Sequence, residues 1–201
     1  MKNNPKIDKV LEYAKKHGMI RVRDIINERI HPEYLRRLCT KGLLVKIGRG
    51  TYIPADMDFS VNIGLAQVAK RVPHAVICLL SALQFHDIGT QLPHEVWIAI
   101  DGKAAKPQID YPPVRVMRFS DKSLSEGIEE HTIEGVSVQV YNKAKTVADC
   151  FKYRNKIGLD VALEALKDCR QRKLCSNDEL WRYAKICRVS AVMKSYLEAI
   201  Q

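Results

Sequence analysis

The 201-residue sequence lacks several patterns that mark common classes of protein. No run of about 18 apolar residues occurs, so we expect no transmembrane helix. The opening stretch, MKNNPKIDKVLEYAKKHGM, has no apolar segment of the kind found in signal peptides. The chain also contains no GxxxxGK(S/T) phosphate loop, no GxSxG and no HExxH. These absences predict a cytoplasmic protein without a membrane partner.

Cysteine pairs are also missing, although six cysteines are present. None of them forms a CxxC pair, and no histidine lies at a metal-ligand spacing from them. We therefore interpret them as reduced thiols, several on apolar helix faces. We expect neither a metal site nor a cofactor.

The charge is strongly positive and unevenly distributed. Lysine and arginine number 33 against 23 acidic residues, which gives a net charge of +10. Residues 1–60 carry +6, residues 74–141 carry −4 and residues 152–201 carry +5. Basic surface favours a polyanion such as nucleic acid, although solvated helix faces are often basic as well.

The first sixty residues have the pattern of three helices followed by a β-hairpin. Apolar residues at helical spacing predict helices over 5–16, 20–30 and 31–42. In the second helix, Val22, Ile25 and Ile26 are expected to face inward. The stretch LLVKIGRGTYI then alternates at period two on both sides of Gly48-Arg49-Gly50, which predicts a hairpin.

This order of elements is typical of a winged helix-turn-helix. The third helix would offer its outer face to the major groove of double-stranded DNA, and the hairpin would be the wing. The predicted DNA-binding residues are Tyr34, Arg36, Arg37 and Lys41 on the helix, with Lys46 and Arg49 on the wing. The same elements also occur in protein-interaction modules, which stays an alternative.

The rest of the chain predicts an α+β fold, with a mixed α/β domain that ends in a helical bundle. We expect a linker near 54–60, a sheet over about 75–141 and helices over about 144–200, which divides the chain into domains 1–56 and 57–201. Ser81, Asp160 and either Ser176 or Asn177 are the expected helix N-caps.

Evidence for catalysis in this half is weak. Asp101-Gly102-Lys103 resembles the D-x-K end of a nuclease metal motif, but a strand that ends in Asp-Gly is also a common turn. The adjacent residues His86 and Asp87 would point apart on a helix. A nucleic-acid-processing enzyme therefore stays the second hypothesis, and we predict no catalytic residues.

Several segments resemble AbiEi-type antitoxins of bacterial type IV toxin–antitoxin systems. The pattern G-L-L-x-x-x-x-R-G-x-Y of that family is matched from Gly42 to Tyr52. SALQFHDIG is similar to a Ser-Ala-Leu…His segment of the family. In VYNKAKTVADCFKYRNKIGLDVALEAL, a Lys-Thr pair followed by Asp is matched by Lys145, Thr146 and Asp149. The resemblance covers nearly the whole chain.

The resemblance implies a transcriptional repressor that is not an enzyme. Family members bind inverted repeats in the promoter of their own operon, either as a dimer or as two monomers. Their C-terminal domain counters a cognate nucleotidyltransferase-like toxin without forming a stable complex. A solitary winged-helix regulator remains the alternative if no toxin is encoded nearby.

Overall fold

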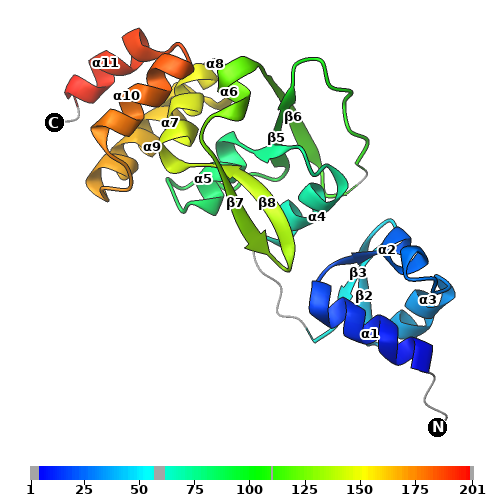
Figure 1. Cartoon of the computed structure of the whole chain (residues 1–201). Helices are drawn as coiled ribbons and strands as arrows, with labels where there is room; N and C mark the ends of the chain where they lie inside the picture. Colours follow the sequence, from blue (N-terminus) through cyan, green and yellow to red (C-terminus); the bar gives the residue numbers. More distant parts are fainter. Residues whose placement is uncertain (1–4, 57–61, 110, 200–201) are drawn as a thin grey trace.

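A computed structural model describes residues 5–56, 62–109 and 111–199. Figure 1 shows a smaller N-terminal part (residues 5–56) beside a larger C-terminal part (residues 62–109 and 111–199). The chain has a mixed α+β fold, as predicted. The linker expected near 54–60 lies for the most part outside the described residues, since these stop at 56 and resume at 62.

The N-terminal part combines three helices with a three-stranded antiparallel sheet of order β1-β3-β2. Its elements are α1 (Pro5–His17), β1 (Ile20–Arg21), α2 (Val22–Asn27), α3 (Glu33–Thr40), β2 (Leu44–Gly48) and β3 (Thr51–Pro54). The first and third predicted helices and the predicted hairpin are confirmed.

One small core holds this part together. Val10 and Ala14 on α1 pack with Leu35 and Leu38 on α3 and with Leu44 on β2, and all five are buried. Full burial of one such aliphatic side chain contributes about 1.5–3 kcal/mol. The apolar spacing of the sequence therefore selects the faces of α1 and α3 that turn inward, and it leaves their polar faces to solvent.

The second predicted helix is shorter than expected. Its first two residues form β1 instead, where Ile20 pairs with Tyr52. Ile25 is buried as predicted, but Ile26 is 53% exposed, so that inward assignment is wrong. Successive residues of a helix are rotated by about 100°, and a helix of fewer than two turns presents only a narrow stripe to the core.

The C-terminal part is built on a five-stranded mixed sheet of order β6-β5-β4-β8-β7. The strands are β4 (Val76–Ile77), β5 (Val96–Asp101), β6 (Val114–Phe119), β7 (Ile128–Ile133) and β8 (Val136–Tyr141). The helices are α4 (Ile63–Arg71), α5 (Leu79–Phe85), α6 (Asp121–Ser125), α7 (Lys143–Lys152), α8 (Arg154–Ile157), α9 (Leu159–Gln171), α10 (Asn177–Ile186) and α11 (Ser190–Ala199).

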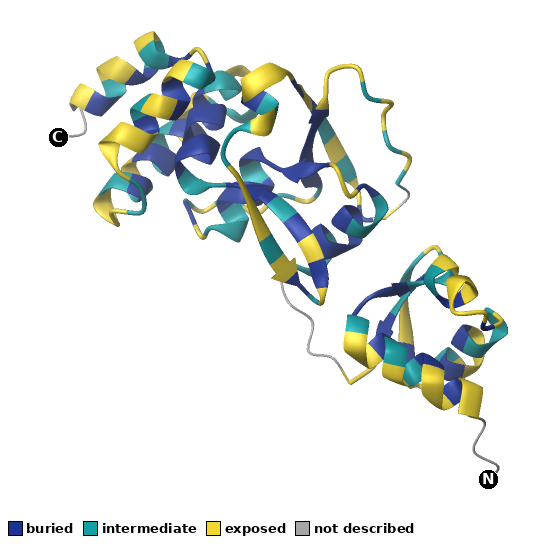
Figure 2. Ribbon diagram, in the orientation of Figure 1, coloured by how far each residue is buried: buried dark blue, intermediate teal, exposed yellow. Residues whose placement is uncertain are grey.

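Helices cover both faces of this sheet. Alternate strand residues such as Ile98 and Val138 pack against α4, while Ala99 and Tyr141 face the opposite layer of α5, α7, α9, α10 and α11. Figure 2 shows the central strands and α7 largely buried, with exposed residues on the outer helices and on β7. In the described parts of the chain, no helix is long and apolar enough to span a membrane.

Two of the expected helix caps are wrong. α5 begins at Leu79 with Cys78 as its N-cap, and Ser81 lies inside the helix, where its hydroxyl accepts a hydrogen bond from the Trp97 amide at 2.9 Å. The N-cap of α9 is Gly158, and Asp160 lies in the first turn. At Ser81, a tertiary partner occupies the hydroxyl, and the helix starts before the residue with the higher capping preference.

The Ser176 cap is confirmed. Its hydroxyl accepts a hydrogen bond from the Glu179 amide, and the Glu179 carboxylate accepts one from the Ser176 amide. This reciprocal pair is a capping box, and it satisfies two amides at the start of α10 that have no partner within the helix.

Candidate nucleic-acid interface

The predicted DNA-binding residues of the third helix all lie on or next to α3. Its buried stripe anchors the helix in the core, and Arg36, Arg37 and Lys41 are exposed on the other side. Tyr34 is half-buried beside them, and the guanidinium carbon of Arg37 lies 5.6 Å from its ring centroid. The structure therefore brings three cations and one aromatic ring onto the solvent side of one helix.

A single carboxylate holds the two arginines in place. Arg36 donates to Glu33 through Nη2 at 2.7 Å and through Nε at 3.0 Å, and Nε of Arg37 lies 3.6 Å from Oε1 of the same residue. The hydrogen bonds from Arg36 lower the pKa of Glu33, and the charges of both arginines act in the same direction. Because both guanidinium groups are largely exposed, solvent screens these ion pairs and they contribute little to stability.

The hairpin places its two predicted DNA-binding residues on the surface. Lys46 on β2 pairs in register with Tyr52, and Arg49 lies at the tip, with both basic side chains exposed. Gly50 has φ = +69°, a left-handed conformation that favours glycine. The charge at the tip therefore sits on a turn that depends on its neighbouring glycine.

Gly48 has a different role from the one its turn position indicates. A Cβ atom at this position would lie 3.3 Å from Nη2 of Arg71 on α4, so the missing side chain makes room for that arginine. The same Nη2 donates a hydrogen bond of 3.1 Å to the carbonyl oxygen of Arg49. The tip of the hairpin is thus attached to the C-terminal part through its backbone, while the side chain of Arg49 stays exposed.

Lys70, the neighbour of Arg71, makes a second connection between the two parts. Its ammonium donates to the carbonyl oxygen of Met19 at 2.5 Å and lies 3.2 Å from the Asp24 carboxylate. Asp24 also accepts a hydrogen bond from the Arg21 amide and so caps α2. One carboxylate therefore fixes both the start of α2 and its position against α4.

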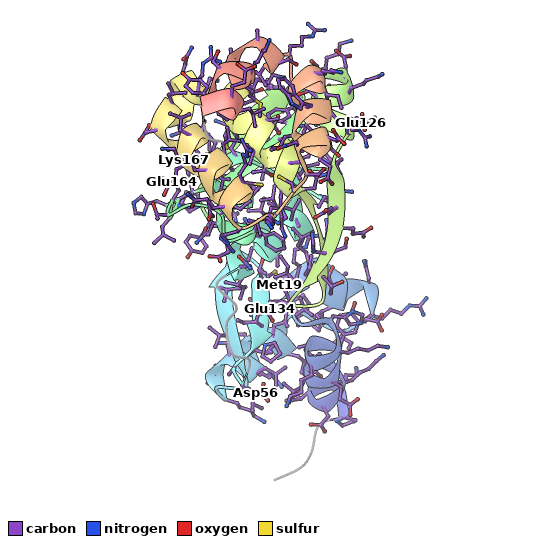
Figure 3. All side chains as sticks on the ribbon, turned by 90° about the vertical axis from the view of Figure 1, so that its left-hand side faces the viewer. Met19, Asp56, Glu126, Glu134, Glu164 and Lys167 are labelled. Atoms are coloured by element: carbon purple, nitrogen blue, oxygen red, sulfur yellow. The ribbon has the colours of Figure 1, made fainter. Side chains whose placement is uncertain are left out.

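Apolar contacts complete this junction. Met19 and Ile53 are buried with residues of α4 and of the β7–β8 hairpin. Figure 3 shows Met19 and Glu134 near each other where the two parts meet. A Cβ atom on Gly135, beside Glu134, would lie 2.8 Å from the carbonyl oxygen of His17. Sequence reasoning missed this junction, because α4 has an ordinary amphipathic pattern and nothing in it marks Lys70 or Arg71.

Three of the C-terminal residues that carry the antitoxin resemblance, Lys145, Thr146 and Asp149, are fully buried. Lys145 and Asp149 form a fully buried ion pair with an Nζ–Oδ2 distance of 2.5 Å. Burial raises the pKa of Asp149, and the Lys145 charge opposes that rise. Thr146 donates a hydrogen bond to the carbonyl oxygen of Tyr141 at 3.1 Å, which also lies 2.7 Å from Nε2 of His86. These residues join α7, α5 and the end of β8 into one core.

The candidate nuclease residues do not form a recognisable centre. Asp101 ends β5, and its carboxylate accepts a hydrogen bond from the Lys103 amide at 2.7 Å, which is the geometry of an Asx turn. Glu95 lies 2.5 Å from Arg115 instead. Across residues 5–56, 62–109 and 111–199, no three His, Cys, Asp or Glu side chains are grouped so that they could hold a metal ion.

Comparison with known structures supports the overall fold. The RV2827C protein from Mycobacterium tuberculosis has a similar crystal structure, with a TM-score of 0.59 over 90% of this chain and 72% of that protein, at 13% sequence identity. At this identity the likeness concerns the fold alone. No curated protein matches the sequence.

A family comparison identifies the N-terminal part. Residues 8–55 match the model of a family described as transcriptional regulator, AbiEi antitoxin. The matched segment runs from α1 through the end of β3 and includes every predicted DNA-binding residue. The N-terminal part of this chain, residues 8–55, is therefore similar to the family described as transcriptional regulator, AbiEi antitoxin.

Proposed function

We propose that the chain is a DNA-binding antitoxin of a type IV toxin–antitoxin system that represses its own operon and acts by binding rather than catalysis. Residues 1–56 would be a winged helix-turn-helix domain and residues 57–201 the antitoxin domain. The observation that carries this proposal is the exposed cationic face of α3 beside a hairpin with two further cations, within the segment that matches the regulator family.

In this proposal α3 enters the major groove of an operator half-site. Arg36 and Arg37 leave Glu33 for backbone phosphates or a guanine edge, and Lys41 contacts a phosphate near the end of the helix. Tyr34 contacts a phosphate or a thymine methyl group. Two observations support these roles: the three cations are exposed, and the ion pairs of Arg36 and Arg37 with Glu33 are screened by solvent.

The hairpin acts as the wing, with Lys46 and Arg49 on the adjacent backbone or minor groove. Arg71 on α4 supports this role, because its hydrogen bond to the Arg49 carbonyl oxygen fixes the position of the hairpin tip. A wing whose backbone is held in place loses less conformational freedom on binding. Inverted repeats would be bound by two copies of the chain, either as a dimer or as monomers that meet on DNA.

The test is a titration of the region upstream of the gene, against random DNA of equal length, at several salt concentrations. Arg36→Ala/Arg37→Ala should weaken operator binding by at least tenfold, and Arg49→Ala should lower the salt slope by about one unit for each lost phosphate contact. Lys16→Ala, which removes one exposed cation on α1, is the matched control for Arg49→Ala. Equal binding by the arginine variants and the wild type would contradict the assignment of α3 and the wing.

The toxin role needs a separate experiment, and it rests on the resemblance at Lys145, Thr146 and Asp149. Co-expression of the chain with a nucleotidyltransferase-like protein encoded beside it should restore growth, without co-purification of the two proteins. If operator binding holds but growth is not restored, the chain is a solitary winged-helix regulator. The arrangement of Asp101 and Glu95 gives the nuclease alternative no support.

A further inference from the structure

A basic hollow lies in the C-terminal part, away from α3. It has a volume of about 640 Å³ and is bordered by the segment at α6, the end of α7 and the end of α10. Figure 1 shows these helices at the end of the molecule opposite to α3. DNA seated on α3 and the wing would therefore occupy a different surface.

Four cations from three elements surround this hollow. They are Lys122 on α6, Lys152 on α7, and Lys185 and Arg188 at the end of α10. Among the described residues of the lining, Asp121 is the one acidic residue, so these residues carry a net charge of +3. Within the described ranges, no salt bridge joins any of the four cations to a carboxylate, although the chain forms such pairs elsewhere.

One cation of the lining, Lys152, is held in a fixed position by its neighbours. Lys152 donates a hydrogen bond of 2.9 Å to the hydroxyl of Ser123, which is only 6% exposed. Its ammonium also lies 5.5 Å from the ring centroid of Phe119 and 5.7 Å from that of Tyr153. A lysine held between a hydroxyl and two aromatic rings has lost much of its rotamer freedom before any ligand arrives.

The donors that face the hollow match an oxyanion. The Ser123 hydroxyl accepts from Lys152, so its own hydrogen remains to donate, and lysine and arginine can only donate. Four like charges that converge without carboxylate partners repel each other in the free protein, and a multiply charged anion relieves that repulsion. The described residues that line the hollow include no aromatic side chain, so none of them offers a ring on which a nucleobase could stack.

Cations near helix ends have a simpler explanation, because Lys152 and Lys185 lie in the last turns of α7 and α10 and interact favourably with the helix dipole. That explanation does not require the ends of two helices and Lys122 of α6 to converge on one hollow. We propose that this hollow is a binding site for the phosphate chain of a free ligand, such as a nucleotide or an inorganic polyphosphate.

The experiment measures binding by calorimetry at physiological salt, with tripolyphosphate, ATP, inorganic phosphate and a short random DNA duplex as separate probes. The variant Lys122→Met/Lys185→Met removes two exposed cations that form no salt bridge with the residues the structure describes. The control Lys167→Met/Lys173→Met makes the same change of charge on two exposed residues, one within α9 and one just after it.

We expect tripolyphosphate and ATP to bind the wild type and the control equally well, and the variant at least tenfold more weakly. Similar affinities for tripolyphosphate and ATP would support recognition of the phosphate chain alone. Equal losses in variant and control would overturn the proposal, because the effect would then come from net charge. Binding of the duplex but of no free phosphate compound would also overturn it, in favour of a nucleic-acid surface. Operator binding through α3 is measured separately, so failure of one proposal leaves the other testable.

Discussion

Removal of Lys145 tests whether the buried ion pair is essential for the C-terminal fold. Both side chains of the pair are 0% exposed, and their charged atoms are 2.5 Å apart. In Lys145→Met, one Asp149 oxygen would keep only the weak thiol donor of Cys187 at 3.2 Å, and the other would lose its partner. The loss of one member of a buried pair costs about 3–5 kcal/mol, because the remaining charge stays desolvated.

For a chain of this length, that loss corresponds to a decrease in Tm of roughly 6–20 °C, at about 2–4 °C per kcal/mol. The assay is urea unfolding at pH 7, followed by far-ultraviolet circular dichroism. Lys167→Met, on the exposed side of α9 (Figure 3), is the matched control and should change stability by no more than about 0.5 kcal/mol.

The double variant Lys145→Met/Asp149→Leu shows how much of the lost stability comes from the unpaired Asp149 carboxylate and how much from the loss of the Lys145 side chain itself. Replacement of both charges by apolar groups removes the uncompensated carboxylate, so the double variant should recover at least half of the lost stability. In the single variant, burial without Lys145 should raise the pKa of Asp149 further. The folded form then holds a proton that the unfolded form has released, so the single variant should become more stable relative to wild type as the pH falls from 7 to 5. A loss below about 1 kcal/mol in Lys145→Met, or a double variant no more stable than the single one, would refute the reasoning.

Two further changes test the junction and the half-buried His86. Gly135→Ala should lower the free energy of unfolding by about 1–3 kcal/mol, because φ is +70° and the new methyl would lie 2.8 Å from the His17 carbonyl oxygen. The control Gly102→Ala should have a much smaller effect, because the nearest atom to its new Cβ would be 3.8 Å away. Equal unfolding curves for the two variants would argue against the junction. Burial lowers the pKa of His86, so its contribution to stability is complete above about pH 6.5 and is lost as the pH falls toward the folded-state pKa. His86→Gln keeps an amide donor for the Tyr141 carbonyl and should show a smaller decrease in Tm between pH 7 and 5, whereas parallel decreases would assign that loss to other groups.

Much of the secondary structure could be predicted because it depends on short-range patterns. The spacing of Val10 and Ala14, and that of Leu35 and Leu38, selects a buried helix face before any partner is known. The glycines at 48 and 50 within an alternating run are sufficient to predict the hairpin. The exposed cations of α3 follow from the same periodicity, since residues outside the apolar stripe face solvent.

Two of the errors occurred where a long-range partner overrode a local preference. Ile20 joins β3 and not the second helix, because strand pairing satisfies its backbone. Serine is preferred at helix N-caps, but Ser81 lies inside α5, where its hydroxyl accepts a hydrogen bond from the Trp97 amide. Neither partner lies near enough in the sequence for a local rule to find it.

The sequence by itself determined the helix faces, the hairpin with Arg49 at its tip and the basic ends of the chain, because these depend on residues close together along the backbone. Only the tertiary structure decided that Arg71 holds the hairpin tip and that Lys145 and Asp149 are fully buried. It also decided that Lys122, Lys152 and Lys185 border one hollow. Burial and convergence depend on how elements far apart in the sequence pack, and the charge of a residue does not indicate which of these elements it will contact.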